Sequence, residues 1–173
     1  MSALLLADRV LRRLYAACAA LAALSVVMIA ILVLISIVSR AMGVYTPGMT
    51  EGAGYGMAAA GSLGLAYTFM HGGHVRVDLL ISRLTERTRS RVELLALSIT
   101  MLLIGYAAWY LCRLVLVSFR FQDRSAGSDG LLLWMPQLPI AFGFVVFTVS
   151  IVHTIALGFA GRSGERTANE NER

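Results

Sequence analysis

The chain has 173 residues, of which 58% are hydrophobic and 14% are charged. A water-soluble domain usually carries about a quarter charged residues, so this composition excludes an ordinary soluble domain. All fifteen basic residues are arginines, which gives a net charge of +5. These arginines are spread along the edges of apolar segments, so they do not form the basic patch that nucleic-acid binding requires.

Four uncharged runs divide the chain, at residues 14–39, 52–75, 94–112 and 130–161. Each is about as long as a helix that crosses a bilayer core of roughly 30 Å. The sequence therefore predicts an all-α integral membrane protein with one membrane domain, residues 1–161, and a disordered tail at 162–173. The predicted membrane helices cover residues 14–38, 52–70, 92–117 and 138–160.

The arginines also predict how these helices are oriented. With Arg113 of the third predicted helix set aside, eleven lie in the N-terminal segment, the connection between the second and third helices, and the C-terminal tail, whereas three lie in the other two connections. Cytoplasmic segments of membrane proteins carry the excess of basic residues. Both termini are therefore predicted to be cytoplasmic.

The segment at residues 77–87 has a different pattern. Its apolar residues recur at helical spacing, and its charged residues occupy the other side of that helix. This pattern is typical of a short amphipathic helix that lies in the membrane interface with its apolar face in the lipid. The alternative is a solvated loop.

Within the second predicted helix, small residues recur every four positions: Gly52, Gly56, Ala60 and Gly64. In a helix this spacing places all four on one stripe. Glycine lowers helix propensity, and small residues allow two membrane helices to pack closely. We therefore expect this stripe to hold a second helix.

The acid that opens this helix, Glu51, is expected at the external surface of the membrane. Arg113, near the end of the third helix, is expected at the same level, and so is Arg40 at the end of the first. An ion pair of Glu51 with either arginine is possible, and the alternative for Arg113 is a side chain that snorkels to the surface.

The sequence shows no chemistry for transport or catalysis by this chain alone. No Asp or Glu lies deep in a predicted span, and no zinc, phosphate-loop or nucleophile motif occurs. We therefore predict no enzyme activity and no cofactor or metal. A haem held by two of His71, His74 and His153 is the alternative to structural histidines.

Several residues in chain order resemble one family. Residues 73–80 read Gly-His-Val-Arg-Val-Asp-Leu-Leu and include His74, Arg76 and Asp78. Outside this stretch the matching positions are Arg40, Glu51, Gly64, Pro139 and Gly143. With these residues the chain resembles the small membrane subunit of tripartite ATP-independent periplasmic (TRAP) transporters. Pro136 and Pro139 are expected in the first turn of the last helix, where proline needs no backbone donor.

The resemblance implies a non-catalytic subunit of a sodium-coupled importer of organic acids in the bacterial inner membrane. A large multi-spanning transport subunit would carry the substrate and sodium sites, and a periplasmic substrate-binding protein would deliver the substrate. The small subunit would brace the large one, seated through the second helix and residues 74–84. The alternatives are a haem-bearing membrane anchor of a respiratory or quinone-linked enzyme, and a self-sufficient small carrier or channel.

Overall fold

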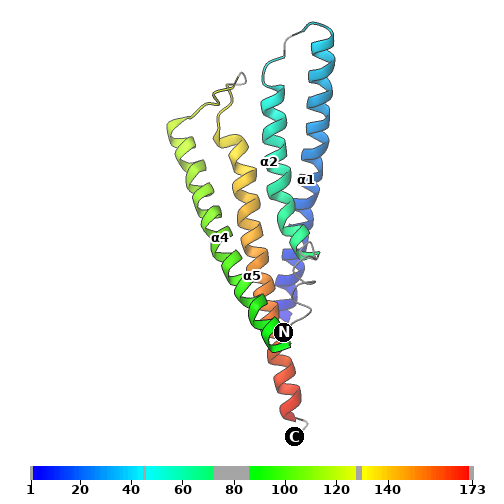
Figure 1. The fold of residues 1–173 in the computed structure, drawn as a ribbon, viewed down its shortest axis with the longest axis vertical. Helices are drawn as coiled ribbons and strands as arrows, with labels where there is room; N and C mark the ends of the chain where they lie inside the picture. Colours follow the sequence, from blue (N-terminus) through cyan, green and yellow to red (C-terminus); the bar gives the residue numbers. More distant parts are fainter. Residues whose placement is uncertain (1, 45, 72–85, 128–129, 172–173) are drawn as a thin grey trace.

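A computed structural model describes residues 2–44, 46–71, 86–127 and 130–171 of the chain. These residues form four helices: α1 (Ser2–Ala41), α2 (Met49–Met70), α4 (Glu86–Phe121) and α5 (Trp134–Asn171) (Figure 1). No strand occurs among them, and one isolated antiparallel bridge joins Arg124 to Leu132 in the α4–α5 connection. The all-helical fold class is confirmed.

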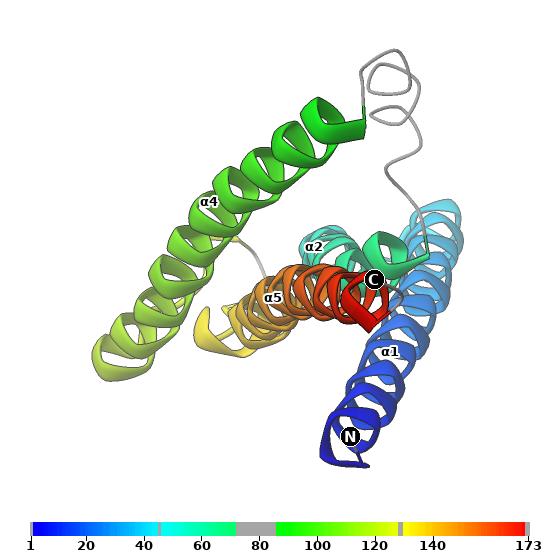
Figure 2. The ribbon, with the colours of Figure 1, turned by 90° about the horizontal axis from the view of Figure 1, so that it is seen from below.

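The helices are arranged as a row. α1 packs against α2, α2 packs against α5, and α5 packs against α4, while α1 and α5 meet over a small area (Figure 2). Both termini lie at one end of the molecule, and the α1–α2 and α4–α5 connections lie at the other. Helix α2 therefore has a helix on two of its sides.

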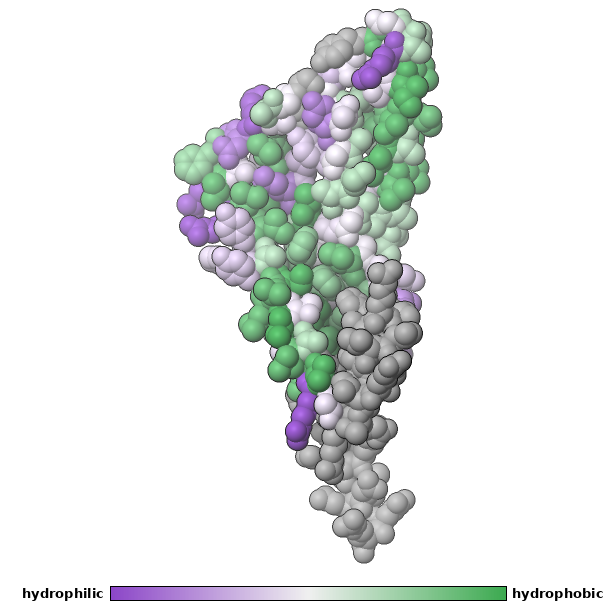
Figure 3. Space-filling view, in the orientation of Figure 1, coloured by the Kyte–Doolittle hydropathy of each residue, from purple (hydrophilic) through white to green (hydrophobic). Residues whose placement is uncertain are grey.

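Three of the four described helices are long and apolar enough to cross a membrane, namely α1, α4 and α5. Hydrophobic side chains cover much of the visible surface, and hydrophilic ones gather toward the end that holds the two connections (Figure 3). Helix α2, which is rich in glycine and alanine, is not one of these three helices. Its membrane crossing stays a prediction.

The observed helix ends differ from the predicted ones. α1 begins at Ser2 rather than at residue 14, and α4 begins at Glu86, within the predicted interfacial helix. The rest of that predicted helix, residues 77–85, lies outside the described residues. α5 continues to Asn171, where the sequence predicted a disordered tail. Gly161 and Gly164 lower helix propensity but keep their backbone donors, and no proline follows Pro139, so nothing in this segment forbids a helix.

The core lies where α1, α2 and α5 meet. Its buried residues are Tyr15, Cys18, Ala22, Leu63, Ala66, Val146, Phe147 and Ile151. Phe69 of α2 adds an edge-to-face contact with Phe147 of α5, with ring centroids 5.6 Å apart. This cluster fixes α2 between its two neighbours.

The backbones of α5 and α2 lie close together at Gly143 of α5. A Cβ atom at Gly143 would lie 2.5 Å from the carbonyl carbon and 2.6 Å from the carbonyl oxygen of Ser62 in α2. The Ser62 hydroxyl is buried there and donates to the Ala59 carbonyl at 3.1 Å. It also lies 3.5 Å from the carbonyl of Pro139. Glycine is therefore required at position 143.

Pro139 does not lie in the first turn of α5. The helix begins at Trp134, so Pro136 is in the first turn, as predicted, and Pro139 is inside the helix. Proline at this position cannot donate a backbone hydrogen bond to the carbonyl one turn before it, that of Met135. The first-turn expectation is thus wrong for Pro139, because the helix starts earlier than residue 138.

Replacing Gly143 with alanine should lower the stability of the isolated chain. The added methyl would force α5 and α2 apart, and overpacking of this kind costs roughly 1–3 kcal/mol. Gly61→Ala is the matched control, because a Cβ at Gly61 meets no atom within 4 Å. Thermal unfolding in detergent, followed by circular dichroism, should show a lower midpoint for Gly143→Ala and an equal or higher one for Gly61→Ala. Equal midpoints for Gly143→Ala and the wild type would contradict this.

Candidate functional site

The predicted stripe of small residues on α2 faces α1 of the same chain. A Cβ at Gly56 would lie 2.8 Å from Cγ1 of Ile29, and one at Gly52 would lie 3.4 Å from Cδ1 of Leu32. At Gly64 the nearest atom is the Cβ of Ala22, at 3.9 Å. The expected second helix is therefore α1. The expectation that the second helix seats the large subunit stays a prediction, and the side available for that contact is not the stripe that faces α1.

Ala60, the remaining member of the stripe, is partly buried. Helix α2 thus uses one side for α1 and another, around Ser62, for α5. None of the described helices packs closely on a third side of α2. The exposed residues on this side are Gly54, Met57, Ala58, Gly61 and Thr68, and we call them the open face of α2.

The open face is made of small or flexible side chains. A Cβ at Gly54 or at Gly61 would meet no atom within 4 Å, and Met57 is 67% exposed. Gly54, Ala58 and Gly61 are spaced four and three residues apart, so they lie on one side of the helix. This spacing of small residues is visible in the sequence, but the longer four-residue repeat that begins at Gly52 was interpreted as the packing surface.

At the end of the molecule that holds the α1–α2 connection, Arg40 and Glu51 line one pocket of about 660 Å³. Arg40 is in the last turn of α1, and Glu51 is in the first turn of α2. The guanidinium carbon of Arg113 instead lies 5.8 Å from the ring centroid of Trp109, on its own helix. The ion pair of Glu51 stays a prediction, and the shared pocket favours Arg40 as its partner.

Toward the other end, the chain holds a polar cluster that the sequence did not predict. Asp8 of α1 accepts hydrogen bonds from Nε of Arg12 at 2.9 Å. The same carboxylate lies 3.3 Å from Nε2 of His153 on α5, whose side chain is 9% exposed. The sequence does not indicate a role for Asp8, because its partner His153 is about 145 residues away along the chain.

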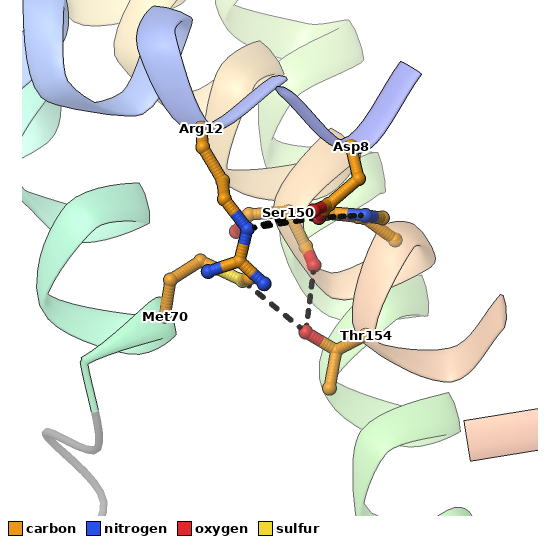
Figure 4. Close-up of polar contacts among 6 residues, drawn as sticks. Asp8, Arg12, Met70, Ser150 and Thr154 are labelled. Carbon is orange, nitrogen blue, oxygen red and sulfur yellow. Dashed lines mark hydrogen bonds and ion pairs between the residues drawn. The ribbon is translucent and has the colours of Figure 1, made fainter. Parts of the chain in front are cut away.

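A second polar contact joins α5 to α2 beside this cluster. The Thr154 hydroxyl contacts Sδ of Met70 at 3.5 Å and the Ser150 carbonyl at 3.0 Å. Figure 4 shows Asp8 and Arg12 coming from α1, Met70 from α2, and Ser150 and Thr154 from α5. Polar contacts therefore tie three helices together at this level.

The histidines do not form a ligand pair among the described residues. Nδ1 of His71 lies 2.9 Å from the Tyr67 carbonyl, and its ring stacks on that of Tyr67 at 4.0 Å. His153 contacts Asp8 on another helix. His74, Arg76 and Asp78 lie outside the described residues. Within the described residues, no group of three or more His, Cys, Asp or Glu side chains could hold a metal ion.

The fold and these surfaces define a small helical membrane protein whose distinctive features are helix-packing faces. Residues 29–161 match the family model described as tripartite ATP-independent periplasmic transporters, DctQ component. The chain belongs to this family, and it is a small membrane subunit of a TRAP transporter. Comparisons with curated proteins and with solved structures gave no match. The family gives no support to the haem-bearing alternative.

The Asp8–His153 contact should couple α1 to α5 energetically. A double-mutant cycle with Asp8→Asn and His153→Gln should give a coupling of about 0.5–1.5 kcal/mol, as expected for a largely buried hydrogen bond to a carboxylate. The control cycle pairs Asp8→Asn with Arg12→Gln, whose side chain is 58% exposed. It should give a coupling below about 0.5 kcal/mol, because water screens that pair. Additive effects of Asp8→Asn and His153→Gln would show that the contact is not formed.

Proposed function

We propose that this chain is the non-catalytic small subunit of a sodium-coupled secondary importer of organic acids, and that it braces and anchors the large transport subunit. Membership of the DctQ component family supports the transporter role. The observation that carries the bracing role is the open face of α2. A periplasmic substrate-binding protein would deliver the substrate to the large subunit.

The open face is suited to a protein helix rather than to lipid. Lipid-facing surfaces of membrane helices are rich in leucine, isoleucine and valine, whereas small residues let two helices approach closely. The outward side of α1 has the first composition, with exposed residues Leu24, Val27, Ile31, Leu34 and Val38. The open face of α2 consists mainly of small residues instead. A helix of the large subunit is the occupant we propose.

Such a helix would meet a rigid surface. α1 packs on one side of α2 and α5 on another, and the close contact of Gly143 with Ser62 fixes their spacing. A brace must resist displacement while its partner changes shape. The row α1–α2–α5 resists displacement, because a movement of α2 would disrupt its interfaces with both α1 and α5.

Sodium and substrate binding would belong to the large subunit. No Asp or Glu lies deep in a span predicted for this chain, since Glu93 is at the edge of the third span. An intramembrane ion site usually relies on acids or on broken helices. Each of the four described helices is continuous over its range. The chain therefore offers scaffold surfaces and no coupling site in its described part.

Filling the open face should weaken assembly without unfolding the chain. Gly61→Leu should reduce co-purification with the large subunit by tenfold or more, since about 1.4 kcal/mol of lost packing gives that factor. The melting midpoint of the isolated chain should stay unchanged. Gly56→Leu is the contrasting variant, because its side chain would collide with Ile29 and lower the midpoint of the isolated chain.

Ala30→Leu, at an exposed position on α1, is the control for added bulk on a lipid-facing surface. It should leave both co-purification and melting unchanged. Unchanged assembly of Gly61→Leu would contradict the proposed role of the open face.

We also infer that both termini are cytoplasmic, on the distribution of arginines and on the position of both termini at one end of the molecule. Alkaline phosphatase, which is active only in the periplasm, reports this orientation. Fusion after Gly127, in the α4–α5 connection, should give active enzyme, and fusion at the C-terminus should give inactive enzyme. The reverse pattern would contradict the orientation.

A further inference from the structure

The pocket between the ends of α1 and α2 contains both signs of charge. Arg40 and Glu51 line it together with uncharged residues that include the hydroxyl-bearing Ser36, Thr46 and Thr50. The C-terminal end of a helix favours a cation, and the N-terminal end favours an acid, so each charge stands where its own helix stabilises it. The volume of about 660 Å³ is within the range of pockets that hold small molecules.

A second, more apolar pocket adjoins the first. Its volume is about 530 Å³, and it shares Ser36, Arg40 and Thr50 with the first pocket. Its other lining residues are Val33, Ile37, Ala41, Met49 and Ala53. Val33 is 43% exposed and Ile37 is 59% exposed, so this groove lies on the outer surface of the helices.

The two pockets together have the chemistry of a phospholipid. Apolar residues line the part that runs along α1, a helix long and apolar enough to cross a membrane. Charged and hydroxyl residues line the part at the helix ends, where the membrane meets water. In Figure 3 the surface on the α1 side is largely apolar, and hydrophilic side chains lie toward this end of the molecule, most of them on the side of the α4–α5 connection. Arg40 lines both parts and so stands at their junction.

We propose that this composite pocket binds a phospholipid with a phosphoethanolamine headgroup. The phosphate would bind the Arg40 guanidinium, whose planar set of donors matches phosphate oxygens. The primary ammonium would bind the Glu51 carboxylate, and an acyl chain would cover Val33, Ile37 and Ala53. Glu51 would repel a purely anionic headgroup and would accept N–H bonds from a primary ammonium, so the pocket selects a headgroup that carries both signs and an N–H donor.

Native mass spectrometry of the full chain in detergent tests this with three lipids of equal acyl chains. Their headgroups are phosphoethanolamine, phosphoglycerol and phosphocholine, the last of which has no N–H donor. The wild type should retain the first about tenfold better than the other two, the factor given by about 1.4 kcal/mol of charge-assisted bonding. Arg40→Gln should weaken all three lipids. Glu51→Gln should abolish the preference while phosphoglycerol binding stays or rises.

Two further variants test the apolar part of the pocket and control for the loss of an arginine. Ala53→Leu narrows the apolar groove without changing a charge, and it should reduce retention of all three lipids. Arg113→Gln is the control, because this arginine is not among the residues of either pocket and lies over Trp109. It should bind lipid as the wild type does. Circular dichroism of each variant confirms that the helices are intact.

Equal retention of the three lipids by the wild type would overturn the proposal, and so would unchanged retention in Arg40→Gln and Glu51→Gln. Lipid retention is finally measured on the complex with the large subunit. The lipid should remain bound in it, and its loss on assembly would assign the pocket to the partner protein instead. Because the isolated chain is measured first, failure of this proposal leaves the bracing role untouched.

Discussion

The close approach of α5 to α2 at Gly143 is the constraint on which the rest of the structure depends. At this point a side chain as small as alanine would collide with the Ser62 backbone. The contact sets the spacing of the two central helices. It allows Phe147 to reach Phe69 and brings the Pro139 carbonyl to 3.5 Å from the Ser62 hydroxyl. A wider spacing would open the core and separate the Ser62 hydroxyl from the Pro139 carbonyl, while its bond to Ala59 in its own helix would remain.

The same constraint explains why α2 differs in composition from the other helices. A helix that has close neighbours on several sides needs small residues, and small residues lower its hydropathy. α2 is therefore not among the described helices whose hydropathy is that of a membrane span, which are α1, α4 and α5. Its surface is used for α1 at Gly56 and for α5 at Ser62, and the open face remains for the partner that we propose. In this chain low hydropathy indicates helix contacts rather than a loop.

The sequence predicted the local features well and the pairing of helices poorly. Uncharged runs and helical spacing identified the four helices, and Gly143 was selected through the family resemblance. The partner of Gly56 could not be inferred, because helical periodicity shows which residues share a side but not which helix covers that side. The contact of Asp8 with His153 was missed for the same reason, since it joins opposite ends of the chain. Helix ends were the least accurate, as in the extension of α5 past residue 160.

The central claim is that the open face of α2 contacts a helix of the large subunit, and photo-crosslinking tests it most directly. A diazirine-bearing amino acid would replace Ala58, on the open face, or Ala30, on the lipid-facing side of α1, in the assembled complex. Irradiation should crosslink position 58 to the large subunit and position 30 to lipid. Lipid adducts alone at position 58, in a complex that is otherwise intact, would contradict the account.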